Sequence, residues 1–129
     1  MSQNGSNCVR CALVTGAAGG IGRATAIVLS RAGWRLLLTD RDAGGLEAVA
    51  GRVKAEVSRE AVVIKGDVTD ARLGSELAEA VRSKGWVLGG LVNNAGAISG
   101  SPLEHTTDAE WHRLFEVNVT SQIACIKGW

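Results

Sequence analysis

The fold is decided by Val14-Thr15-Gly16-Ala17-Ala18-Gly19-Gly20-Ile21-Gly22, a glycine-rich stretch that joins two segments of different periodicity. The short apolar run Arg10–Thr15 before it predicts a strand, and the residues from Ile21 onward repeat at helical spacing. The glycines therefore lie at a strand-to-helix turn. Backbone N–H groups and the positive end of a helix dipole face such a turn, so it predicts a binding site for phosphate groups.

Each glycine of the turn has its own physical role. Gly16 permits a sharp exit from the strand, Gly20 lets backbone amides approach a pyrophosphate, and Gly22 lets the helix pack closely on the strand. A tight left-handed connection that binds no ligand is the alternative for a glycine turn considered alone. Motifs elsewhere in the chain are needed to distinguish a phosphate-binding turn from a connection that binds no ligand.

Strand and helix patterns alternate after the turn. This alternation predicts an α/β fold in which residues 1–129 form one domain, a doubly wound parallel sheet of strand order 3-2-1-4 with a crevice between strands one and four. Gly33 is placed to end the first helix. The later strands are expected at Trp34–Thr39, Ala61–Lys65 and Val87–Val92, and the apolar helix positions are Ile21, Ala24, Thr25, Val28, Leu29 and Ala32, then Leu46, Val49, Ala50, Val53 and Val57, then Leu73, Leu77, Ala80 and Val81.

Local signals mark the ends of the later helices. Asp70 is placed to cap the third helix and Gly85 to end it. Thr107-Asp108-Ala109-Glu110 predicts a capping box. The helix that it opens takes its apolar face from Trp111, Leu114 and Phe115.

The segment Ala97–Leu103 is rich in Gly, Ser and Pro, which predicts a loop beside the substrate. Ser99 and Ser101 are interpreted as loop residues and not as nucleophiles, because no histidine and carboxylate are spaced to activate them.

Composition narrows the class of protein. The chain has 129 residues, 46% hydrophobic content and a formal net charge of +1, which fits a globular protein that buries roughly two thirds of its unfolded surface. The sequence contains no run of basic residues that would indicate nucleic acid as a partner. Met1–Asn7 is polar and no apolar run approaches the length of a membrane span, so we expect a cytoplasmic protein that binds a small molecule.

The cysteines and histidines do not predict a metal site. Cys8 and Cys11 form a single C-x-x-C, and residues three apart on an extended segment point to opposite faces. Cys125 is interpreted as a small helix residue in a reducing compartment, and His105 and His112 as surface residues.

Asp40 ends the expected second strand, 18 residues after Gly22. A dinucleotide-binding fold places near this position the acid that hydrogen-bonds the adenosine ribose. A carboxylate there accepts bonds from both ribose hydroxyls and repels a 2′-phosphate, which predicts NAD in preference to NADP. Arg41 and Arg23 favour the opposite preference, because a guanidinium could meet a 2′-phosphate. The alternative role of Asp40 is that of a solvated turn residue.

Three motifs follow one another in order: Gly-x-x-x-Gly-x-Gly at Gly16–Gly22, then Asn93-Asn94-Ala95-Gly96, then Asn118 within Val117-Asn118-Val119-Thr120. Together they resemble the short-chain dehydrogenase/reductase family, over about Cys11 to Ile123. The resemblance implies a Rossmann-type fold and an NAD(P)-dependent oxidoreductase that transfers hydride between its cofactor and an alcohol or ketone.

The resemblance also implies roles for single residues. Asp67 and Val68 would lie against the adenine, the Asn93–Gly96 motif would line a ribose of the cofactor, and Asn118 would have a catalytic role, holding a water and a lysine of the proton relay. If the family resemblance is set aside, Asp67 and the Asn93–Gly96 motif are interpreted as two ordinary turns. Asn118 is then a helix asparagine whose side chain is hydrogen-bonded to backbone groups. The expected cofactor-binding set is Thr15, Gly16, Ala18, Gly20, Ile21, Gly22, Asp40, Arg41, Asp67, Val68, Asn93, Asn94, Ala95 and Gly96.

The sequence departs from the family in its catalytic half. The family uses a serine and a Tyr-x-x-x-Lys pair, whereas this sequence has no tyrosine and has Ile123 four residues before Lys127. We therefore expect the amino-terminal half of a family member, inactive by itself. Uncovered apolar surface would make it marginally stable or cause association with further copies. The competing function is a nucleotide-binding or interaction module without chemistry.

Overall fold

The computed structural model describes residues 7–129. The polar segment Met1–Asn7, on which the expectation of a cytoplasmic protein partly rests, lies outside the described range apart from Asn7. A four-stranded parallel sheet of order β3-β2-β1-β4 forms the centre of the fold, as the sequence predicts. The elements are β1 (Val9–Thr15), α1 (Gly20–Arg31), β2 (Arg35–Asp40), α2 (Ala43–Val57), β3 (Val62–Lys65), α3 (Leu73–Ser83), β4 (Trp86–Val92), η1 (Leu103–His105), α4 (Asp108–Phe115), η2 (Glu116–Thr120) and α5 (Ser121–Lys127).

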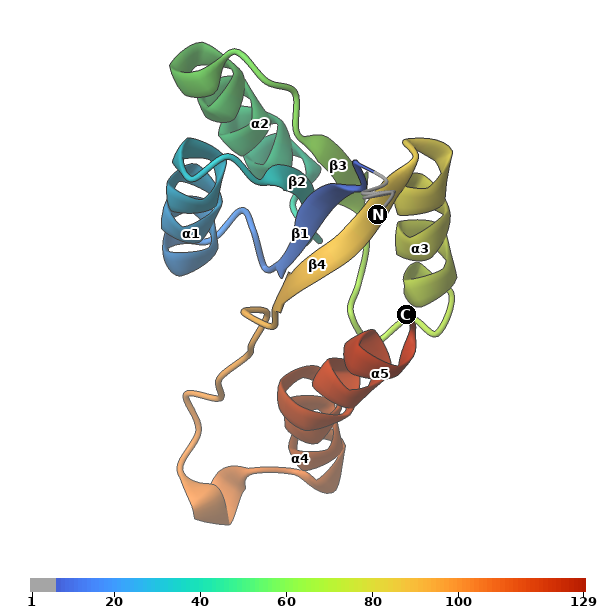
Figure 1. The fold of residues 1–129 in the computed structure, drawn as a ribbon. Coiled ribbons are helices and arrows are strands. Elements are labelled where there is room, and N and C mark those ends of the chain that lie inside the picture. Colours follow the sequence, from blue (N-terminus) through green and yellow to red (C-terminus); the bar gives the residue numbers. More distant parts are fainter. Residues whose placement is uncertain (1–6) are drawn as a thin grey trace.

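Helices cover both faces of this sheet, with α1 and α2 on one face and α3 on the other (Figure 1). The alternation of side chains along β2 shows why both faces need a cover. Leu36 and Leu38 pack with α1 and α2, whereas Leu37 packs with α3. Full burial of one such leucine contributes about 1.5–3 kcal/mol. The continuous apolar run in β2 is thus that of a strand buried on both sides.

The first helix is present, but its buried face is not the apolar series that predicted it. Ile21 is 75% exposed and Val28 61% exposed. The residues that face the sheet are Gly22, Ala26, Ile27 and Ser30. Three of these four residues are small, because the helix begins directly at the strand end and packs closely on it.

Two glycines end helices as the sequence predicts, while Asp70 does not cap one. Gly33 and Gly85 follow α1 and α3 with φ of 94° and 66°, in the left-handed region that favours glycine. The N-cap of α3 is Arg72, whose side chain makes no capping bond. The prediction for Asp70 is wrong because its carboxylate accepts the N–H of Arg72 at 2.9 Å, one step before the helix begins.

One of the two hydrogen bonds of the predicted capping box at the start of α4 is confirmed, the bond accepted by the Thr107 side chain. The Thr107 hydroxyl accepts the N–H of Glu110 at 3.2 Å. Glu110 itself pairs with Arg113. The loop expected at Ala97–Leu103 is irregular up to Pro102, after which Leu103 begins the short helix η1.

Gly89 is an extra residue in β4. In the pairing with β1, Cys11 lies opposite Leu88 and Ala12 opposite Gly90, so the ladder skips Gly89. A Cβ on Gly89 would lie 3.1 Å from the Cβ of Arg10 and from the ring of Trp34. The strand therefore tolerates its glycines because a bulge and a close packing contact occur there.

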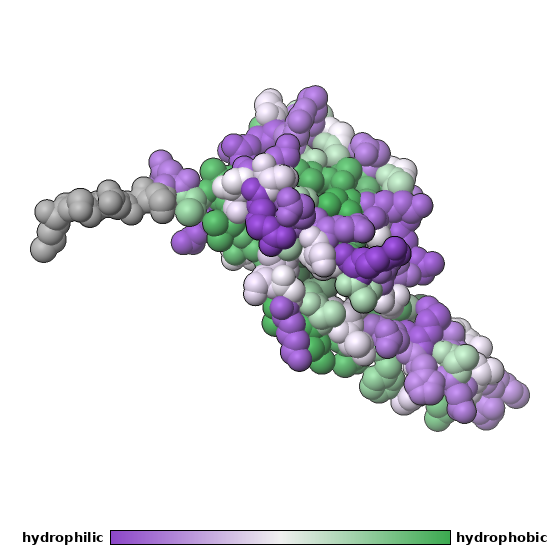
Figure 2. All heavy atoms as spheres, turned by 90° about the vertical axis from the view of Figure 1, so that its right-hand side faces the viewer, coloured by the Kyte–Doolittle hydropathy of each residue, from purple (hydrophilic) through white to green (hydrophobic). Residues whose placement is uncertain are grey.

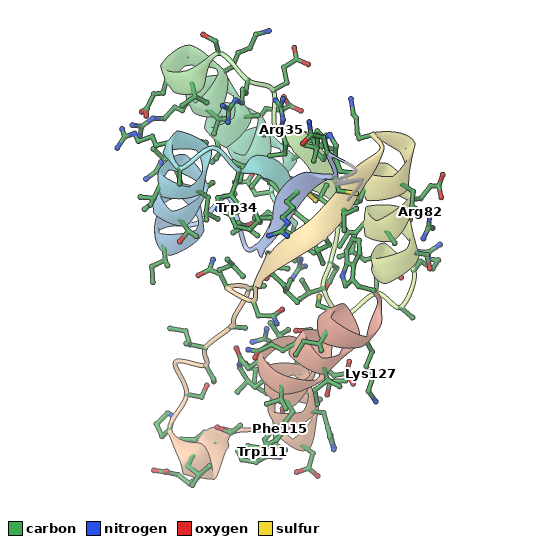
Figure 3. The ribbon with its side chains drawn as sticks, viewed as in Figure 1. Trp34, Arg35, Arg82, Trp111, Phe115 and Lys127 are labelled. Carbon is green, nitrogen blue, oxygen red and sulfur yellow. The ribbon has the colours of Figure 1, made fainter. Side chains whose placement is uncertain are left out.

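Helices α4 and α5, joined by the π-helical turn η2, form a lobe that projects from the sheet in both views (Figures 1 and 2). Polar and apolar side chains are mixed over the face of the lobe in Figure 2. The rings of Trp111 and Phe115 lie side by side, with centroids 5.1 Å apart (Figure 3). Between residues 7 and 129, no helix is long and apolar enough to cross a membrane.

Large apolar side chains of this lobe are exposed, as the sequence leads us to expect. Trp111 is 50% exposed and Phe115 47%, so the two are not the buried face of α4. The association that such a surface favours stays a prediction. The large exposed apolar residues of the lobe are Trp111, Phe115, Val119, Ile123, Ile126 and Trp129.

Candidate functional site

A cleft of about 470 Å³ opens at the carboxyl edge of the sheet. It lies where the strand order reverses between β1 and β4, which is the switch point where open α/β sheets bind ligands. The ends of all four strands and the C-terminal lobe supply its walls. The lining residues are Gly16, Gly19, Gly20, Ile21, Asp40, Arg41, Gly66, Asp67, Val68, Asn94, Ala95, Gly96, Ala97, Arg113 and Val117.

The glycine turn presents backbone to this cleft. Gly16 has a φ of 61°, which gives the sharp exit from β1. The N-cap of α1 is Gly19, which has no capping side chain, and the first turn contains no acidic residue. The first amides of a helix lack intrahelical acceptors, so those of the first turn of α1 remain available to an anion.

Gly20 and Gly22 differ in their surroundings as the sequence predicts. A Cβ on Gly20 would meet no protein atom within 4 Å, so this residue keeps its backbone open to the cleft. A Cβ on Gly22 would collide with the carbonyl oxygen of Gly16 and would lie 2.8 Å from Asn94 Nδ2. The absence of a side chain at Gly20 therefore leaves the backbone accessible from the cleft, and its absence at Gly22 allows the helix to pack on the strand ends.

Thr15 and Asn94 tie the end of β1 to the segment that follows β4. The Thr15 hydroxyl accepts the N–H groups of Asn94 and Ala95, each at 3.0 Å. Asn94 Nδ2 donates to the carbonyl of Thr15 at 3.2 Å and to that of Gly16 at 3.0 Å. These four bonds fix the glycine turn against the Asn93–Gly96 motif, so the two motifs form one wall.

Asp40 is held in the cleft wall by backbone amides. One carboxylate oxygen accepts the N–H of Ala18 and the other accepts the N–H of Asp42, both at 3.0 Å. The side chain therefore bridges the glycine turn and the start of α2. It is a positioned acceptor that lines the cleft, and its bond from the Asp42 N–H is also a local turn contact.

Asp67 forms the next part of the wall, beside Arg41. Its Oδ1 accepts the N–H of Thr69 at 2.9 Å and the Thr69 hydroxyl at 2.7 Å. The other oxygen, Oδ2, lies 3.7 Å from Arg41 Nε. The two bonds from Thr69 and, to a smaller extent, the charge of Arg41 hold the pKa of Asp67 below its ordinary value. Asp67 is therefore a carboxylate at neutral pH.

Asn118 lies in the π-helical turn η2 and is bonded to the loop after β4. Its Oδ1 accepts the N–H of Ala97 at 2.9 Å, and its Nδ2 donates to the carbonyl of Ala97 at 2.8 Å. Backbone groups thus satisfy this amide, although they belong to the loop and not to its own helix. The pair fixes Ala97, which lines the cleft.

Most of the expected cofactor-binding residues come together in this cleft. Three further expected residues contact lining residues without lining the cleft themselves. The N–H of Ala18 donates to Asp40, the Thr15 hydroxyl accepts the N–H of Asn94, and Gly22 packs against Gly16. Asn93 is half-buried next to Asn94 and does not line the cleft. The expected residues that do line it are Gly16, Gly20, Ile21, Asp40, Arg41, Asp67, Val68, Asn94, Ala95 and Gly96.

Five lining residues were not expected from the sequence: Gly19, Gly66, Ala97, Arg113 and Val117. Helical spacing offered a signal for two of them, because Val117 precedes Asn118 and Arg113 lies one turn before Val117. Glu110 holds Arg113 through two hydrogen bonds, Nε to Oε2 at 2.9 Å and Nη2 to Oε1 at 2.8 Å. This pairing keeps the pKa of Glu110 below its ordinary value.

The cysteines take no part in the cleft. Cys11 is fully buried in β1 and Cys125 is buried in α5, and burial raises the pKa of both thiols. Cys8 is exposed ahead of β1. Within the described range, no three His, Cys, Asp or Glu side chains are grouped so that they could hold a metal ion.

Residues 10–129 match the short chain dehydrogenase family, so the chain belongs to that family. The chain is 34% identical over 107 residues to a protein of Listeria monocytogenes described as an uncharacterized oxidoreductase. That match covers 83% of this chain and 43% of the relative. The resemblance that the three sequence motifs indicate is thereby confirmed.

Two solved structures are similar in fold. A metagenomic short-chain oxidoreductase in complex with NADP has a TM-score of 0.84 at 33% identity, covering 95% of this chain and 55% of that chain. An alcohol dehydrogenase from the archaeon Thermococcus sibiricus, complexed with 5-hydroxy-NADP, has a TM-score of 0.85 at 31% identity, covering 92% and 51%. The present chain therefore spans about half the length of the proteins it matches.

Proposed function

We propose that this chain binds a nicotinamide dinucleotide, NAD in preference to NADP, as the cofactor-binding part of an oxidoreductase that acts on an alcohol or ketone. One observation carries the proposal. The open first turn of α1, the carboxylate of Asp40 and the Asn94–Gly96 backbone line a single cleft at the switch point of the sheet. Family membership supports it independently.

The residues of the cleft fit such a ligand. The backbone at Gly20 is open, so that a phosphate can approach the first amides of α1 without meeting a side chain. Ala95 and Gly96 leave room beside the strand end. Asp67 and Val68 line the same cleft as Asp40, and we propose that they contact the adenine. Together these residues would hold the adenosine and diphosphate portions.

The preference for NAD is proposed from the charge at Asp40. Backbone amides of Ala18 and Asp42 fix both of its oxygens and leave lone pairs for ribose hydroxyls. The negative charge repels a 2′-phosphate. The two similar structures described above contain NADP or a derivative of it, so the preference of this chain has to be measured directly.

The chemistry supplied by a bound nicotinamide is hydride transfer to or from a carbon that bears oxygen. What this chain contributes is the positioning of the ligand. Asn118 holds Ala97 through two hydrogen bonds, which orders the loop after β4 beside the cleft. We propose that Asn118 takes part in the proton relay of the family through this position in η2.

A titration of the chain with NAD and NADP, run beside a hydride-transfer assay with NADH and a panel of ketones, tests this proposal. Binding of NAD with turnover of a ketone supports the oxidoreductase. Binding without turnover supports the second function, a nucleotide-binding module without chemistry, which the lack of any tyrosine in the sequence favours. A folded chain that binds neither dinucleotide rules out both nucleotide-binding functions and leaves the interaction module as the remaining alternative.

A further inference from the structure

Two carboxylates and a guanidinium meet at one end of the cleft: Asp40, Asp67 and Arg41. Arg41 is adjacent to Asp40 in the chain, yet it forms its ion pair with Asp67, at 3.7 Å from Nε to Oδ2. Its side chain is 76% exposed and that of Asp67 is 40% exposed. The Arg41 guanidinium is therefore directed toward Asp67, which follows the end of β3.

The two carboxylates are fixed, and Arg41 is the group that can change its partner. Thr69 holds Oδ1 of Asp67 with its N–H and its hydroxyl, at 2.9 and 2.7 Å. The amides of Ala18 and Asp42 hold both oxygens of Asp40. Arg41 has a long side chain with several rotatable bonds, and its pair with Asp67 is loose and largely exposed.

We propose that Asp67 is a positioning residue for cofactor selectivity, which engages the Arg41 guanidinium and so withholds it from a 2′-phosphate. The inference rests on the proposed function, because it places the adenosine ribose at Asp40. Asp67 and Asp40 then act in the same direction. Asp40 repels the 2′-phosphate, and Asp67 keeps the adjacent cation from compensating for that repulsion.

The substitution Asp67→Asn separates this role from ordinary binding. Asparagine keeps an oxygen that can accept the Thr69 bonds, but it no longer pairs with Arg41. Any lost contact with the adenine weakens NAD and NADP alike, so the ratio of their dissociation constants isolates the effect on the 2′ position. Exposed ion pairs contribute about 0.2–1 kcal/mol, so we expect this ratio to shift toward NADP by a factor of roughly 1.4 to 5.

Calorimetric titrations of the full chain with NAD and NADP test the proposal. The expected result is a shift toward NADP in Asp67→Asn that disappears in the double variant Asp67→Asn/Arg41→Ala. Asp70→Asn is the matched control, because Asp70 pairs with Arg72 at 3.0 Å and does not line this cleft. An equal shift in the control, or one that persists without Arg41, overturns the proposal.

A second variant keeps the proposal testable if Asp67→Asn fails to fold. Arg41→Gln changes an exposed side chain, and we expect it to leave the NAD to NADP ratio nearly unchanged, because Asp67 already engages the guanidinium. A large loss of NADP affinity in this variant would show that Arg41 is already available to the phosphate. If the unaltered chain binds neither dinucleotide, the proposed function fails too, whereas NAD binding with an unmoved ratio overturns only this inference.

Discussion

Asn94 Nδ2 donates hydrogen bonds to the carbonyl oxygens of both Thr15 and Gly16, at 3.2 and 3.0 Å, across the switch point of the sheet. These bonds join the segment after β4 to the turn that opens α1. They hold two motifs that lie far apart in the sequence in one wall of the cleft.

Removal of the Asn94 amide should therefore destabilise the protein. In Asn94→Ala, the carbonyl groups of Thr15 and Gly16 each lose one partly buried donor, although Gly16 keeps the N–H of Gly19, and we expect the free energy of unfolding to fall by about 1–3 kcal/mol. Urea denaturation measures this change. Asn93→Ala is the control, since no side-chain hydrogen bond of Asn93 occurs among the described residues, and an equal loss there would refute the role of Asn94.

Gly20→Ala and Gly22→Ala should separate ligand binding from stability. A Cβ at Gly20 has open space, so we expect the free energy of unfolding to change by less than about 1 kcal/mol while affinity for NAD falls at least tenfold. A Cβ at Gly22 collides with Gly16, which should cost about 1–3 kcal/mol of stability. Denaturation and titration of both variants measure the difference, and identical behaviour would contradict it.

Loss of the charge at Asp40 should weaken the preference for NAD. Asp40→Asn keeps the size of the side chain and removes the repulsion of a 2′-phosphate, at the loss of one of the two bonds from the Ala18 and Asp42 amides, so we expect the preference to fall about tenfold. Dissociation constants for NAD and NADP measure it. Asp42→Asn is the matched control, because Asp42 caps α2 through the N–H of Gly45 and does not line the cleft. A preference that Asp40→Asn leaves unaltered would argue against the role of Asp40.

Asp67 should contribute stability that depends on pH. Its pKa lies below the ordinary value in the folded state, chiefly because of the two bonds from Thr69. The contribution is therefore fully present above the unfolded pKa of about 3.9 and is lost as the pH falls through the folded pKa. We expect the difference in unfolding free energy between the unaltered chain and Asp67→Asn to be larger at pH 7 than at pH 3. A difference that does not change with pH would contradict the assignment.

The sequence predicts the sheet well because its strands are short apolar runs separated by helices of clear periodicity. Leu36, Leu37 and Leu38 can all be buried only in a strand covered on both faces, which indicates a parallel sheet. The face of α1 was less predictable. Its exposed Ile21 and Val28 carry the periodic apolar signal, whereas the contact with the strand is made by small residues such as Gly22.

The cleft could be predicted where a motif marks it and not where only tertiary packing creates it. Asp40 was placed by its distance in sequence from the glycine turn, and it does line the cleft. Arg113 was missed because an arginine paired with Glu110 on a helix is usually a solvated surface group. The choice of Asp67 as the partner of Arg41 depends on how two strand ends meet, which no local pattern encodes.

The central claim is that the first amides of α1 and the neighbouring strand ends hold a dinucleotide. Calorimetric titration of the folded chain with NAD tests it most directly, with the fold checked by circular dichroism in the same buffer. We predict saturable binding of one NAD per chain that Gly20→Ala weakens at least tenfold. A folded chain that binds neither NAD nor NADP would contradict the account.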